Sequence, residues 1–445
     1  MLGSHPFASQ LQQAVGGRVL VHPRDCDDYP VGGASPKLVA SPVGVQEAAR
    51  VAKLIGDERE RLVVRGGGTK SSRPPCADAL FAVLDMSKCE GVLAYEPGDL
   101  TISVKAGTKL AHLQSVLARH GQFFPCDAAH AARATIGGTL AASANGALRQ
   151  RYGSLRDNTL GMRVALSDGT VAFSGAKVVK SVAGYDAYKL FIGSLGTLGV
   201  IGEVTLKVSP LPGEQALVAI RFASARDAAD AALDVARSPL FVLAMTLHDP
   251  AAGTRIRGLP RTPEERDWLL VIRCGGSRSA VRRQLDGAVA ICERRRGRDF
   301  LETPHEAVAR VWADIAELAA GDAYPSNGFV AARFTGLPAD VPPLVDALRR
   351  AWPTCEITAH PAVGVVYAHV PADASTFSPS TIEAFWKACE RSHWSVQFLS
   401  APPALAAVAR APIPPSIPRG LNQKVKAALD PRGVFDPTRG AAGLL

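Results

Sequence analysis

The run Leu62-Val63-Val64-Arg65-Gly66-Gly67-Gly68-Thr69-Lys70 decides the fold, because three consecutive glycines stop a short β-type run. Glycines in such a turn let bare backbone N–H groups approach an anion, and Thr69 and Lys70 add a hydroxyl and a positive charge. A diphosphate is the natural ligand of such a turn. A glycine-rich turn without a ligand is the alternative for this segment alone.

Two further segments are rich in glycine and other small residues. In residues 134–146, almost all side chains are small enough for the chain to lie flat against a planar ring system, whose edge Thr139 and Ser143 can bond. Close helix packing is the alternative there. Residues 177–201 carry dense glycines before a strand, which indicates close backbone contact with the remainder of an extended ligand.

Two common nucleotide-binding motifs are absent. The glycine turn lacks the Gly-x-x-x-x-Gly-Lys-Ser/Thr spacing of a P-loop, and residues 193–199 do not have the Gly-x-Gly-x-x-Gly spacing of a Rossmann fold. The sequence therefore favours neither fold.

Helices and strands alternate around these segments. Ser41-Pro42 starts a helix, since a capping hydroxyl precedes a proline at the first helical position. Ser167-Asp168-Gly169 predicts a hairpin. Besides Leu62–Arg65, we expect strands at Leu80–Met86, Thr101–Ala106, Leu160–Leu166, Thr170–Phe173 and Val200–Val208, and a helix at Lys109–His120.

A second unit follows Pro210-Leu211-Pro212-Gly213. Its order of elements fits an α+β fold with a split βαβ, ferredoxin-like antiparallel sheet covered by helices on one face. We expect strands at Gln215–Phe222, Phe241–His248, Trp268–Cys274, Gly328–Phe334, Val363–Val370 and Ser395–Leu399, and helices at Ala225–Ser238, Ser279–Arg296, Asp340–Trp352, Thr381–Ser392 and, near the end of the chain, Asn422–Leu429.

Composition limits the class of protein. The 445 residues, 47% hydrophobic and 20% charged, suit two or three globular domains with room to bury an elongated cofactor. The net charge of +9 is spread along the chain, which argues against nucleic-acid binding. The cluster Arg294–Arg298 ends a predicted helix, where a solvated helix end is favoured and an acidic docking partner stays open.

The cysteines and the hydropathy of the chain indicate whether it builds a metal site and whether it spans a membrane. The eight cysteines include no Cys-x-x-Cys pair, and no His cluster has metal-ligand spacing, so we expect no iron–sulfur or zinc site built by this chain. No apolar run reaches the roughly 18 to 20 residues of a membrane span, and Met1 to Gln10 lacks a signal pattern. We therefore expect a cytoplasmic protein without an integral membrane segment.

The three segments together resemble the FAD-binding domain of the vanillyl-alcohol-oxidase, or PCMH-type, superfamily. Residues 178–186 (Val-Val-Lys-Ser-Val-Ala-Gly-Tyr-Asp), residues 193–201 (Gly-Ser-Leu-Gly-Thr-Leu-Gly-Val-Ile) and the ending 429–437 (Leu-Asp-Pro-Arg-Gly-Val-Phe-Asp-Pro) are most similar to the FAD-binding subunits of bacterial glycolate oxidases. The resemblance implies a lead-in over 1–35, a PCMH-type FAD-binding domain of two α+β subdomains over 36–212, a cap over 213–410, and a C-terminal segment, 411–445, that returns to the FAD domain.

The resemblance also implies which residues bind FAD. Arg65 to Lys70 would face the diphosphate, and Pro125 would continue along it. The other implied positions are Thr135, Ile136, Gly137 and Gly138 along the diphosphate, Ser143, Asn145, Gly146, Tyr152 and Gly153 near the isoalloxazine and ribityl parts, and Val200 and Ile201 near the adenine.

Three positions depart from the family pattern. Branches that tether FAD covalently have a histidine where this chain has Thr69, so the resemblance implies non-covalent FAD. Leu195 stands where other members have the glutamate of Gly-Ser-Glu-Gly, and Asp436-Pro437 replaces the usual Asn-Pro.

The catalytic residues are weakly specified. A flavin accepts hydride from a 2-hydroxy acid while a base takes the hydroxyl proton and a cation holds the carboxylate. Catalytic relatives carry a His-x-Gly-Asp-Gly-Asn-x-His type motif, which this chain lacks; residues 360–369 keep only the two histidines, His360 and His369. Both are candidate bases, although a histidine on an apolar strand is more often structural. Arg273 and Arg333 are candidate carboxylate ligands, with structural pairing as the alternative.

Three functions stay open. In the first, the chain is an FAD-binding subunit of a glycolate-type dehydrogenase. The resemblance implies that this complex also contains a second FAD subunit and an iron–sulfur subunit, and that it can associate peripherally with the inner face of the membrane. Alternatively, it is a self-sufficient FAD dehydrogenase of a small 2-hydroxy acid such as glycolate or lactate. A flavin-free scaffold is the third possibility, against which the intact glycine segments argue.

Overall fold

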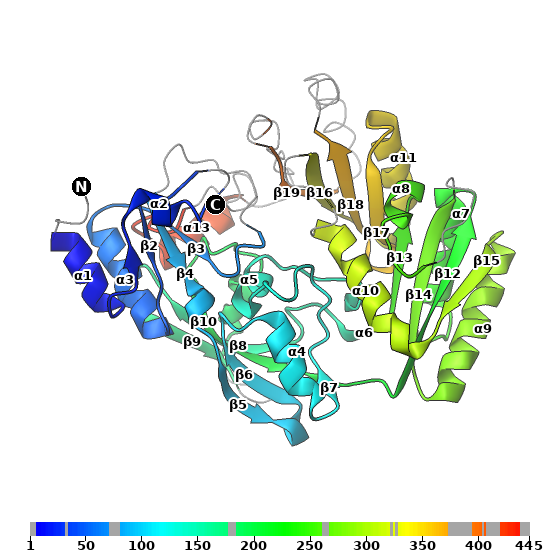
Figure 1. Ribbon diagram of the computed structural model, residues 1–445, viewed down its shortest axis with the longest axis horizontal. Helices are drawn as coiled ribbons and strands as arrows, with labels where there is room; N and C mark the ends of the chain where they lie inside the picture. Colours follow the sequence, from blue (N-terminus) through cyan, green and yellow to red (C-terminus); the bar gives the residue numbers. More distant parts are fainter. Residues whose placement is uncertain are drawn as a thin grey trace.

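The computed structural model describes residues 6–31, 34–70, 81–176, 184–259, 267–320, 324, 328–372, 394–402, 405 and 419–436. Figure 1 shows two units side by side: an N-terminal unit that carries the first two sheets, and a cap built on a third sheet. Helices and mainly antiparallel sheets make up both units, so the predicted α+β class is confirmed.

The first sheet of the N-terminal unit has the strand order β1-β2-β4-β3. Strands β2, β4 and β3 pair in parallel, whereas β1 is antiparallel to β2. Helices α1 and α3 pack on one face of the sheet. The elements are α1 (Pro6–Ala14), β1 (Val19–Leu20), α2 (Pro23–Cys26), β2 (Leu38–Ala40), α3 (Val45–Asp57), β3 (Leu62–Arg65), β4 (Ala82–Asp85) and the 3₁₀ helix η2 (Met86–Lys88).

The second sheet is antiparallel, with the order β5-β6-β10-β8-β9. Its strands are β5 (Val92–Glu96), β6 (Thr101–Lys105), β8 (Thr159–Ala165), β9 (Val171–Gly175) and β10 (Val200–Lys207). The remaining elements of this unit are α4 (Leu110–Ala118), β7 (Gln122–Phe123), α5 (Ile136–Ala141), α6 (Arg149–Tyr152), β11 (Ser209–Pro210) and the 3₁₀ helices η3 (Pro97–Asp99) and η4 (Ala187–Leu190). The hydrophobic core between sheet and helices includes Leu113, Leu140 and Leu206.

The cap is one eight-stranded antiparallel sheet with the order β15-β12-β14-β13-β17-β18-β16-β19. The strands are β12 (Glu214–Phe222), β13 (Ala244–His248), β14 (Trp268–Gly276), β15 (Arg298–Thr303), β16 (Phe329–Thr335), β17 (Glu356–His360), β18 (Val365–Pro371) and β19 (Ser395–Ser400). The helices are α7 (Ala225–Arg237), α8 (Pro250–Gly253), α9 (Arg278–Arg294), α10 (His305–Ala320) and α11 (Val341–Ala351), with the 3₁₀ helices η5 (Pro338–Asp340) and η6 (Pro361–Val363).

Helices cover both faces of the cap sheet, so the expectation of helices on one face was wrong. Helices α7, α9 and α11 share one core with the sheet residues Val218 and Ile220. Helix α10 packs on the opposite face, where Val311 and Trp312 lie with Leu217 and Ala219. Figure 1 shows α10 at the border with the N-terminal unit. The predicted helix Thr381–Ser392 lies outside the described residues.

Several cap elements were not expected from the sequence, among them β15, β17 and α10. Strands β15 and β17 are short, and β17 is separated from β18 only by the 3₁₀ helix η6. Helix α10 had a readable signal, since Val308, Val311, Trp312 and Ile315 recur at i, i+3, i+4 and i+7.

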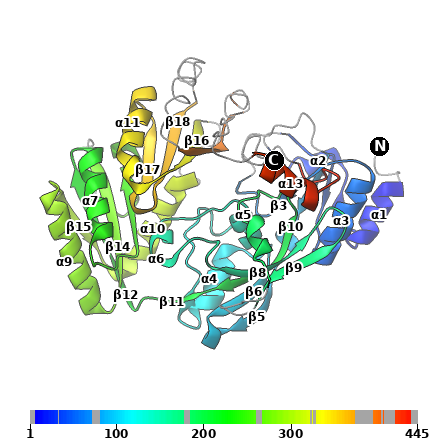
Figure 2. The same ribbon diagram turned by 180° about the vertical axis from the view of Figure 1, so that it is seen from behind.

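Near its C-terminal end, the chain packs against the N-terminal unit. Helix α13 (Arg419–Leu429) lies beside β3 and β10 in both views (Figures 1 and 2), and Leu62 of β3 pairs with Phe435. Lys426 fixes the two parts together: its Nζ donates to the Thr197 carbonyl at 2.6 Å, to the Phe435 carbonyl at 2.8 Å and to Asp430 Oδ2 at 2.6 Å. Asp430 in turn accepts the backbone N–H groups of Val434 and Phe435.

We expect Lys426→Met to lower the free energy of unfolding by about 3–5 kcal/mol, because it leaves the buried Asp430 carboxylate without its cation. Chemical denaturation followed by circular dichroism measures this loss. The matched control is Lys424→Met on the exposed side of α13, which should change stability by less than about 0.5 kcal/mol. Equal losses in the two variants would contradict the assignment.

Candidate functional site

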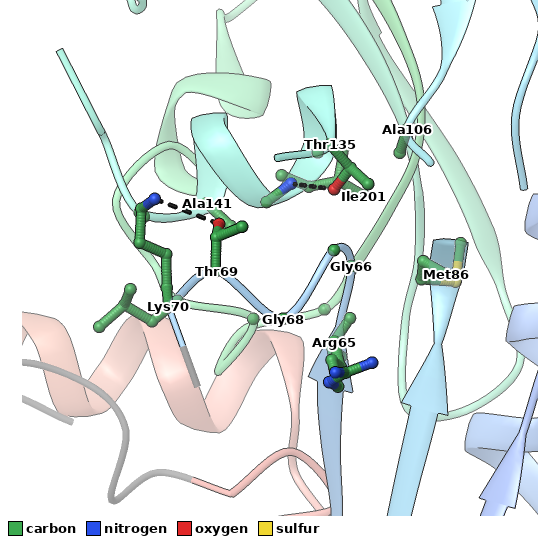
Figure 3. Close-up of a pocket in the computed structure, with 18 residues that line it drawn as sticks. Arg65, Gly66, Gly68, Thr69, Lys70, Met86, Ala106, Thr135, Ala141 and Ile201 are labelled. Carbon is green, nitrogen blue, oxygen red and sulfur yellow. Dashed lines mark hydrogen bonds between the residues drawn. The ribbon is translucent and has the colours of Figure 1, made fainter. Parts of the chain in front are cut away.

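A cavity opens where strand β3 ends. Its space, including the opening to solvent, is about 740 Å³. The turn 65–70 forms one side, and α5 with the segment 195–201 forms the other. The lining residues are Val64, Arg65, Gly66, Gly67, Gly68, Thr69, Lys70, Met86, Ala106, Thr135, Gly137, Gly138, Ala141, Ala142, Leu195, Gly196, Gly199 and Ile201. We call this space the glycine-lined cavity (Figure 3).

Glycines let the segments around this cavity approach one another. A Cβ on Gly67 would lie 1.8 Å from the Arg133 carbonyl oxygen, and one on Gly66 would lie 2.2 Å from Thr135 Oγ1. A Cβ on Gly137 would lie 2.7 Å from the Cβ of Ala106. The sequence interpretation assigned these glycines to ligand contact, and the structure adds a second reason for them: backbone packing between the turn and the entry to α5.

The polar groups of the glycine-lined cavity lie on two sides of the turn. Figure 3 shows Thr69 and Lys70 pointing toward α5, with Lys70 Nζ 3.2 Å from Thr69 Oγ1. Arg65 lies on the other side of the glycines, with its guanidinium 4.9 Å from the centre of the Tyr29 ring. Its Nε is buried and has no hydrogen-bond partner among the described residues.

A second cavity adjoins the first and lies between the N-terminal unit and the cap. Lys70 and Ala142 line both cavities, so the two spaces share a border. The second space is about 530 Å³, including its opening. Its lining comprises Lys70, Asp127, Ala128, Ala129, Ala142, Ala144, Asn145, Gly146 and Ala147 from the N-terminal unit, and Ile315, Ala316, Ala319, Arg333, His360, Tyr367 and Leu399 from the cap. We call it the interdomain cavity.

Arg333 on β16 places a positively charged side chain of the cap in the interdomain cavity. Its guanidinium donates to the Ser143 carbonyl at 3.0 Å and to Gln397 Oε1 at 2.7 Å. Both acceptors are neutral, and no carboxylate of the described residues forms an ion pair with it. Beside it, Tyr367 Oη donates to the Asn145 carbonyl at 3.4 Å, and burial raises the pKa of this phenol. The cap therefore holds the backbone of residues 143–145.

The two histidines predicted as bases occupy different environments. His360 ends β17, lines the interdomain cavity and is 4% exposed, and burial lowers its pKa to about 4. His369 on β18 lines neither cavity, because its ring is stacked on Tyr324 with centroids 3.7 Å apart. Burial, and then the charge of Arg255, lower the pKa of His369 to about 3. Only His360 is placed to meet a ligand.

Asp127 is a cavity residue that sequence reasoning missed. Its Oδ2 accepts Trp312 Nε1 of the cap at 3.0 Å and the Leu148 N–H at 3.2 Å. Its Oδ1 is buried without a hydrogen-bond partner among the described residues, and burial raises the pKa of the carboxyl. A Cβ on Gly146 would lie 1.7 Å from that oxygen, so the glycine is needed for this contact.

The remaining predicted cofactor residues line neither cavity. Ile136 and Val200 are fully buried in cores, and Tyr152 packs edge-on against Phe123 with centroids 5.2 Å apart. The Ser143 carbonyl oxygen accepts a hydrogen bond from Arg333. The predicted positions outside both linings are Pro125, Ile136, Ser143, Tyr152, Gly153 and Val200. Sequence reasoning missed Met86 and Ala106 in the first cavity, whereas Ala141, Leu195, Gly196 and Gly199 lie in segments that it placed beside the ligand. In the second cavity it missed Asp127, Tyr367 and the α10 residues.

The other candidate features have structural explanations. Within the described residues, no group of three His, Cys, Asp or Glu side chains could hold a metal ion. Of the arginine cluster, Arg295 pairs with Asp234 at 2.7 Å and Arg298 with Asp267 at 2.8 Å. Arg273 is engaged by Gln215 and lies over the Trp312 ring. In the part of the chain that the structure describes, no helix has both the length and the apolar character needed to cross a membrane.

Buried histidines should make stability fall in acid. The unfolded chain protonates imidazoles near their ordinary pKa of about 6.5, whereas the folded values are about 4 for His360 and about 3 for His248 and His369. The stability is therefore complete above about pH 6.5 and is lost as the pH falls toward about 4. We expect the Tm to decrease over this window in thermal scans.

The variant His369→Phe isolates one of these titrations, because a phenyl ring can keep the stacking on Tyr324. Its Tm should decrease less steeply with falling pH than that of the wild type. Asp249 has the opposite effect on the pH dependence of the Tm in both the wild type and the variant, since burial raises the pKa of its carboxyl to about 6. Parallel curves would contradict the contribution of His369.

Comparison with known proteins identifies both units. Residues 36–174 match the FAD binding domain family, and residues 211–370 match the C-terminal domain of FAD linked oxidases. The chain therefore belongs to the superfamily of FAD-linked oxidases, and FAD is its cofactor.

Curated relatives are similar over part of their length. The chain is 31% identical over 284 residues to the mitochondrial D-lactate dehydrogenase [cytochrome] of Arabidopsis thaliana, covering 62% of this chain and 49% of that protein. It is 33% identical over 204 residues to glycolate oxidase subunit GlcE of Escherichia coli, 45% of this chain and 57% of that protein. For subunit GlcD of Bacillus subtilis the values are 27% over 273 residues, 60% and 57%. The matched segments span about half the length of these relatives.

Solved structures share the fold over nearly the whole chain. 4-Ethylphenol oxidase from Gulosibacter chungangensis superposes with a TM-score of 0.75 at 15% identity, covering 98% of this chain and 96% of that one. p-Cresol methylhydroxylase gives 0.73 at 14% identity, with coverage of 98% and 96%. The predicted PCMH-type fold is confirmed.

Proposed function

We propose that the chain is an FAD-dependent oxidoreductase that oxidises a small 2-hydroxy acid. The observation that carries this proposal is the shared border of the two cavities: Lys70 and Ala142 connect a glycine-lined space, suited to a diphosphate, with a space that contains Arg333 and His360. A cofactor that extends across this border would present its reactive end to a ligand held by the cap.

The glycine-lined cavity fits the diphosphate of FAD. Thr69 and Lys70 supply a hydroxyl and an ammonium group beside the exposed backbone of the glycine turn. Arg65 brings a buried nitrogen that has no hydrogen-bond partner among the described residues, as expected of a group that a ligand completes. Thr69 offers no imidazole for a covalent link, so we propose that FAD is bound non-covalently.

The interdomain cavity fits the substrate. Arg333 would bind the carboxylate, because its guanidinium has only neutral partners among the described residues. His360 is neutral at physiological pH because burial lowers its pKa to about 4, so a ring nitrogen is available to accept the hydroxyl proton. Bound FAD supplies the acceptor for the hydride that leaves the hydroxyl-bearing carbon, which yields a 2-oxo acid. Asp127 keeps Trp312 and the backbone of Leu148 in place around the reacting groups.

Anaerobic flavin reduction tests this proposal. The FAD-loaded protein is mixed with glycolate or with D- or L-lactate, and the flavin absorption band is followed. We expect the band to bleach with at least one of these acids and to persist with acetate, which has no hydroxyl. A band that stays oxidised with every 2-hydroxy acid would overturn the proposal that this chain oxidises substrate itself.

A second candidate function is that of an FAD-binding subunit in a glycolate oxidase complex. The similarity to the glycolate oxidase subunits GlcD and GlcE favours it. In this proposal, the chain assembles in the cytoplasm with a second FAD subunit and an iron–sulfur subunit, and its partners bring it to the inner face of the membrane. The two proposals are compatible if this chain both reduces its flavin and passes the electrons on.

Affinity purification of the tagged chain from its native cells tests the subunit proposal. We expect stoichiometric co-purification of a flavoprotein and an iron–sulfur protein, identified by mass spectrometry and by the absorption of the iron–sulfur cluster. A homogeneous preparation of this chain alone, obtained at native expression level, would contradict it.

A further inference from the structure

The interdomain cavity has a polar part and an apolar part. Arg333, His360 and Tyr367 come from neighbouring strands of the cap sheet, whereas helix α10 contributes Ile315, Ala316 and Ala319. Figure 1 places α10 between the cap sheet and the N-terminal unit. The N-terminal unit adds five more alanines, namely Ala128, Ala129, Ala142, Ala144 and Ala147.

Helix α10 presents small apolar side chains to this cavity and polar ones elsewhere. Ile315 is 2% exposed, and Ala316 and Ala319 are partly buried. Glu317 lies in the same turn but accepts the His130 backbone N–H at 2.6 Å and does not line the cavity. Ala309 and Ala313 of the same helix are exposed and do not line the cavity.

A second observation points to a ligand in this space. The imidazole of His360 is 4% exposed, and no hydrogen bond to its ring joins it to another described residue. A buried imidazole usually has a partner, and here it faces the cavity instead. The cation Arg333 lies in the same lining. If a ligand's carboxylate binds at Arg333 and His360, the remaining substituents of the ligand would lie against the alanine-rich part of the cavity.

We propose that the substrate is a 2-hydroxy acid with an apolar side chain of several carbons, which packs on the α10 residues Ile315, Ala316 and Ala319. This inference rests on the proposed function and specifies its substrate class. Each methylene buried in the alanine-rich part should improve binding about fourfold. An acid three carbons longer than lactate should therefore be preferred roughly 60-fold. The α10 residues that line the cavity carry no positive charge, so a second carboxylate directed at them should be disfavoured.

The substrate series measures this preference. The rate of anaerobic flavin reduction is recorded at limiting concentrations of glycolate and of both enantiomers of lactate, 2-hydroxyisocaproate and 2-hydroxyglutarate. We expect 2-hydroxyisocaproate to react fastest. Preference for glycolate, lactate or 2-hydroxyglutarate would overturn this inference while leaving the proposed oxidation of 2-hydroxy acids intact.

Helix α10 variants locate the preference. Ala316→Leu and Ala319→Leu fill the alanine-rich part, and Ala313→Leu places the same side chain on the exposed side of the same helix. We expect the ratio of the 2-hydroxyisocaproate rate to the lactate rate to fall at least about tenfold in the first two variants. That ratio should be unchanged in Ala313→Leu. Equal ratios in all three variants would overturn the assignment to α10.

A binding measurement on the wild type tests the inference without relying on turnover or on the folding of a variant. The oxidised wild-type holoprotein is titrated with acetate and with 4-methylpentanoate, and the perturbation of the flavin spectrum is followed. Tighter binding of 4-methylpentanoate supports the inference even if no acid reduces the flavin, in which case only the proposed oxidation fails. Equal affinities would overturn the inference.

Discussion

Gly67→Ala is expected to weaken FAD binding by roughly 5- to 150-fold. A Cβ at this position would lie 1.8 Å from the Arg133 carbonyl oxygen and 3.5 Å from the Ala134 Cα. These neighbours are backbone atoms, so the turn 65–70 or the entry to α5 must move. Such overpacking costs about 1–3 kcal/mol, and the movement displaces the two sides of the glycine-lined cavity relative to each other.

The measurement is a fluorescence titration of the apoprotein with FAD. Gly98→Ala is the matched control, because a Cβ on Gly98 meets no atom within 4 Å. This control should bind FAD within about twofold of the wild type and keep its Tm. Wild-type affinity in Gly67→Ala would contradict the placement of the cofactor beside this turn.

Arg333→Met is expected to reduce the rate of flavin reduction at limiting substrate by roughly 10- to 150-fold. The reason is the loss of a charged hydrogen bond to the substrate carboxylate, worth about 1.5–3 kcal/mol. Methionine keeps much of the side-chain volume, so packing beside Tyr367 and Gln397 should change little. Arg333→Lys should recover part of the rate because it keeps the charge without the planar fork.

Three comparisons separate substrate binding from a structural role of Arg333. The FAD affinity of Arg333→Met should stay within about tenfold of the wild type, since the guanidinium contacts the Ser143 carbonyl and not the glycine turn. The control Arg282→Met removes an exposed cation of α9, paired with Asp286 and Glu302, and should leave the rate unchanged. An Arg333→Met protein with the wild-type rate would show that the carboxylate binds elsewhere.

The glycine-lined cavity was largely predictable because its signal is local. A strand followed by three glycines, and a run of small residues before a helix, can be read from neighbouring positions. The turn 65–70 and residues Thr135, Gly137, Gly138 and Ile201 do line one space. The residues that complete it, such as Met86 and Ala106, directly follow the separate strands β4 and β6 and carry no pattern that points to a ligand.

The interdomain cavity was less predictable because it depends on how the units pack. Asp127 lies in an irregular segment, and its importance comes from contacts with Trp312 and Gly146, which are far away in the sequence. Tyr367 and His369 are two residues apart on the same strand, so their side chains point to the same side of the sheet. Tyr324 covers His369 but not Tyr367, and no strand pattern contains that information.

The central claim, that one FAD spans both cavities, is tested most directly by a crystal structure of the FAD-loaded protein. We expect a diphosphate beside Gly66–Lys70 and a ring system that reaches the interdomain cavity within contact of Arg333 or His360. FAD bound outside the glycine-lined cavity, or with its ring system directed away from the cap, would contradict it.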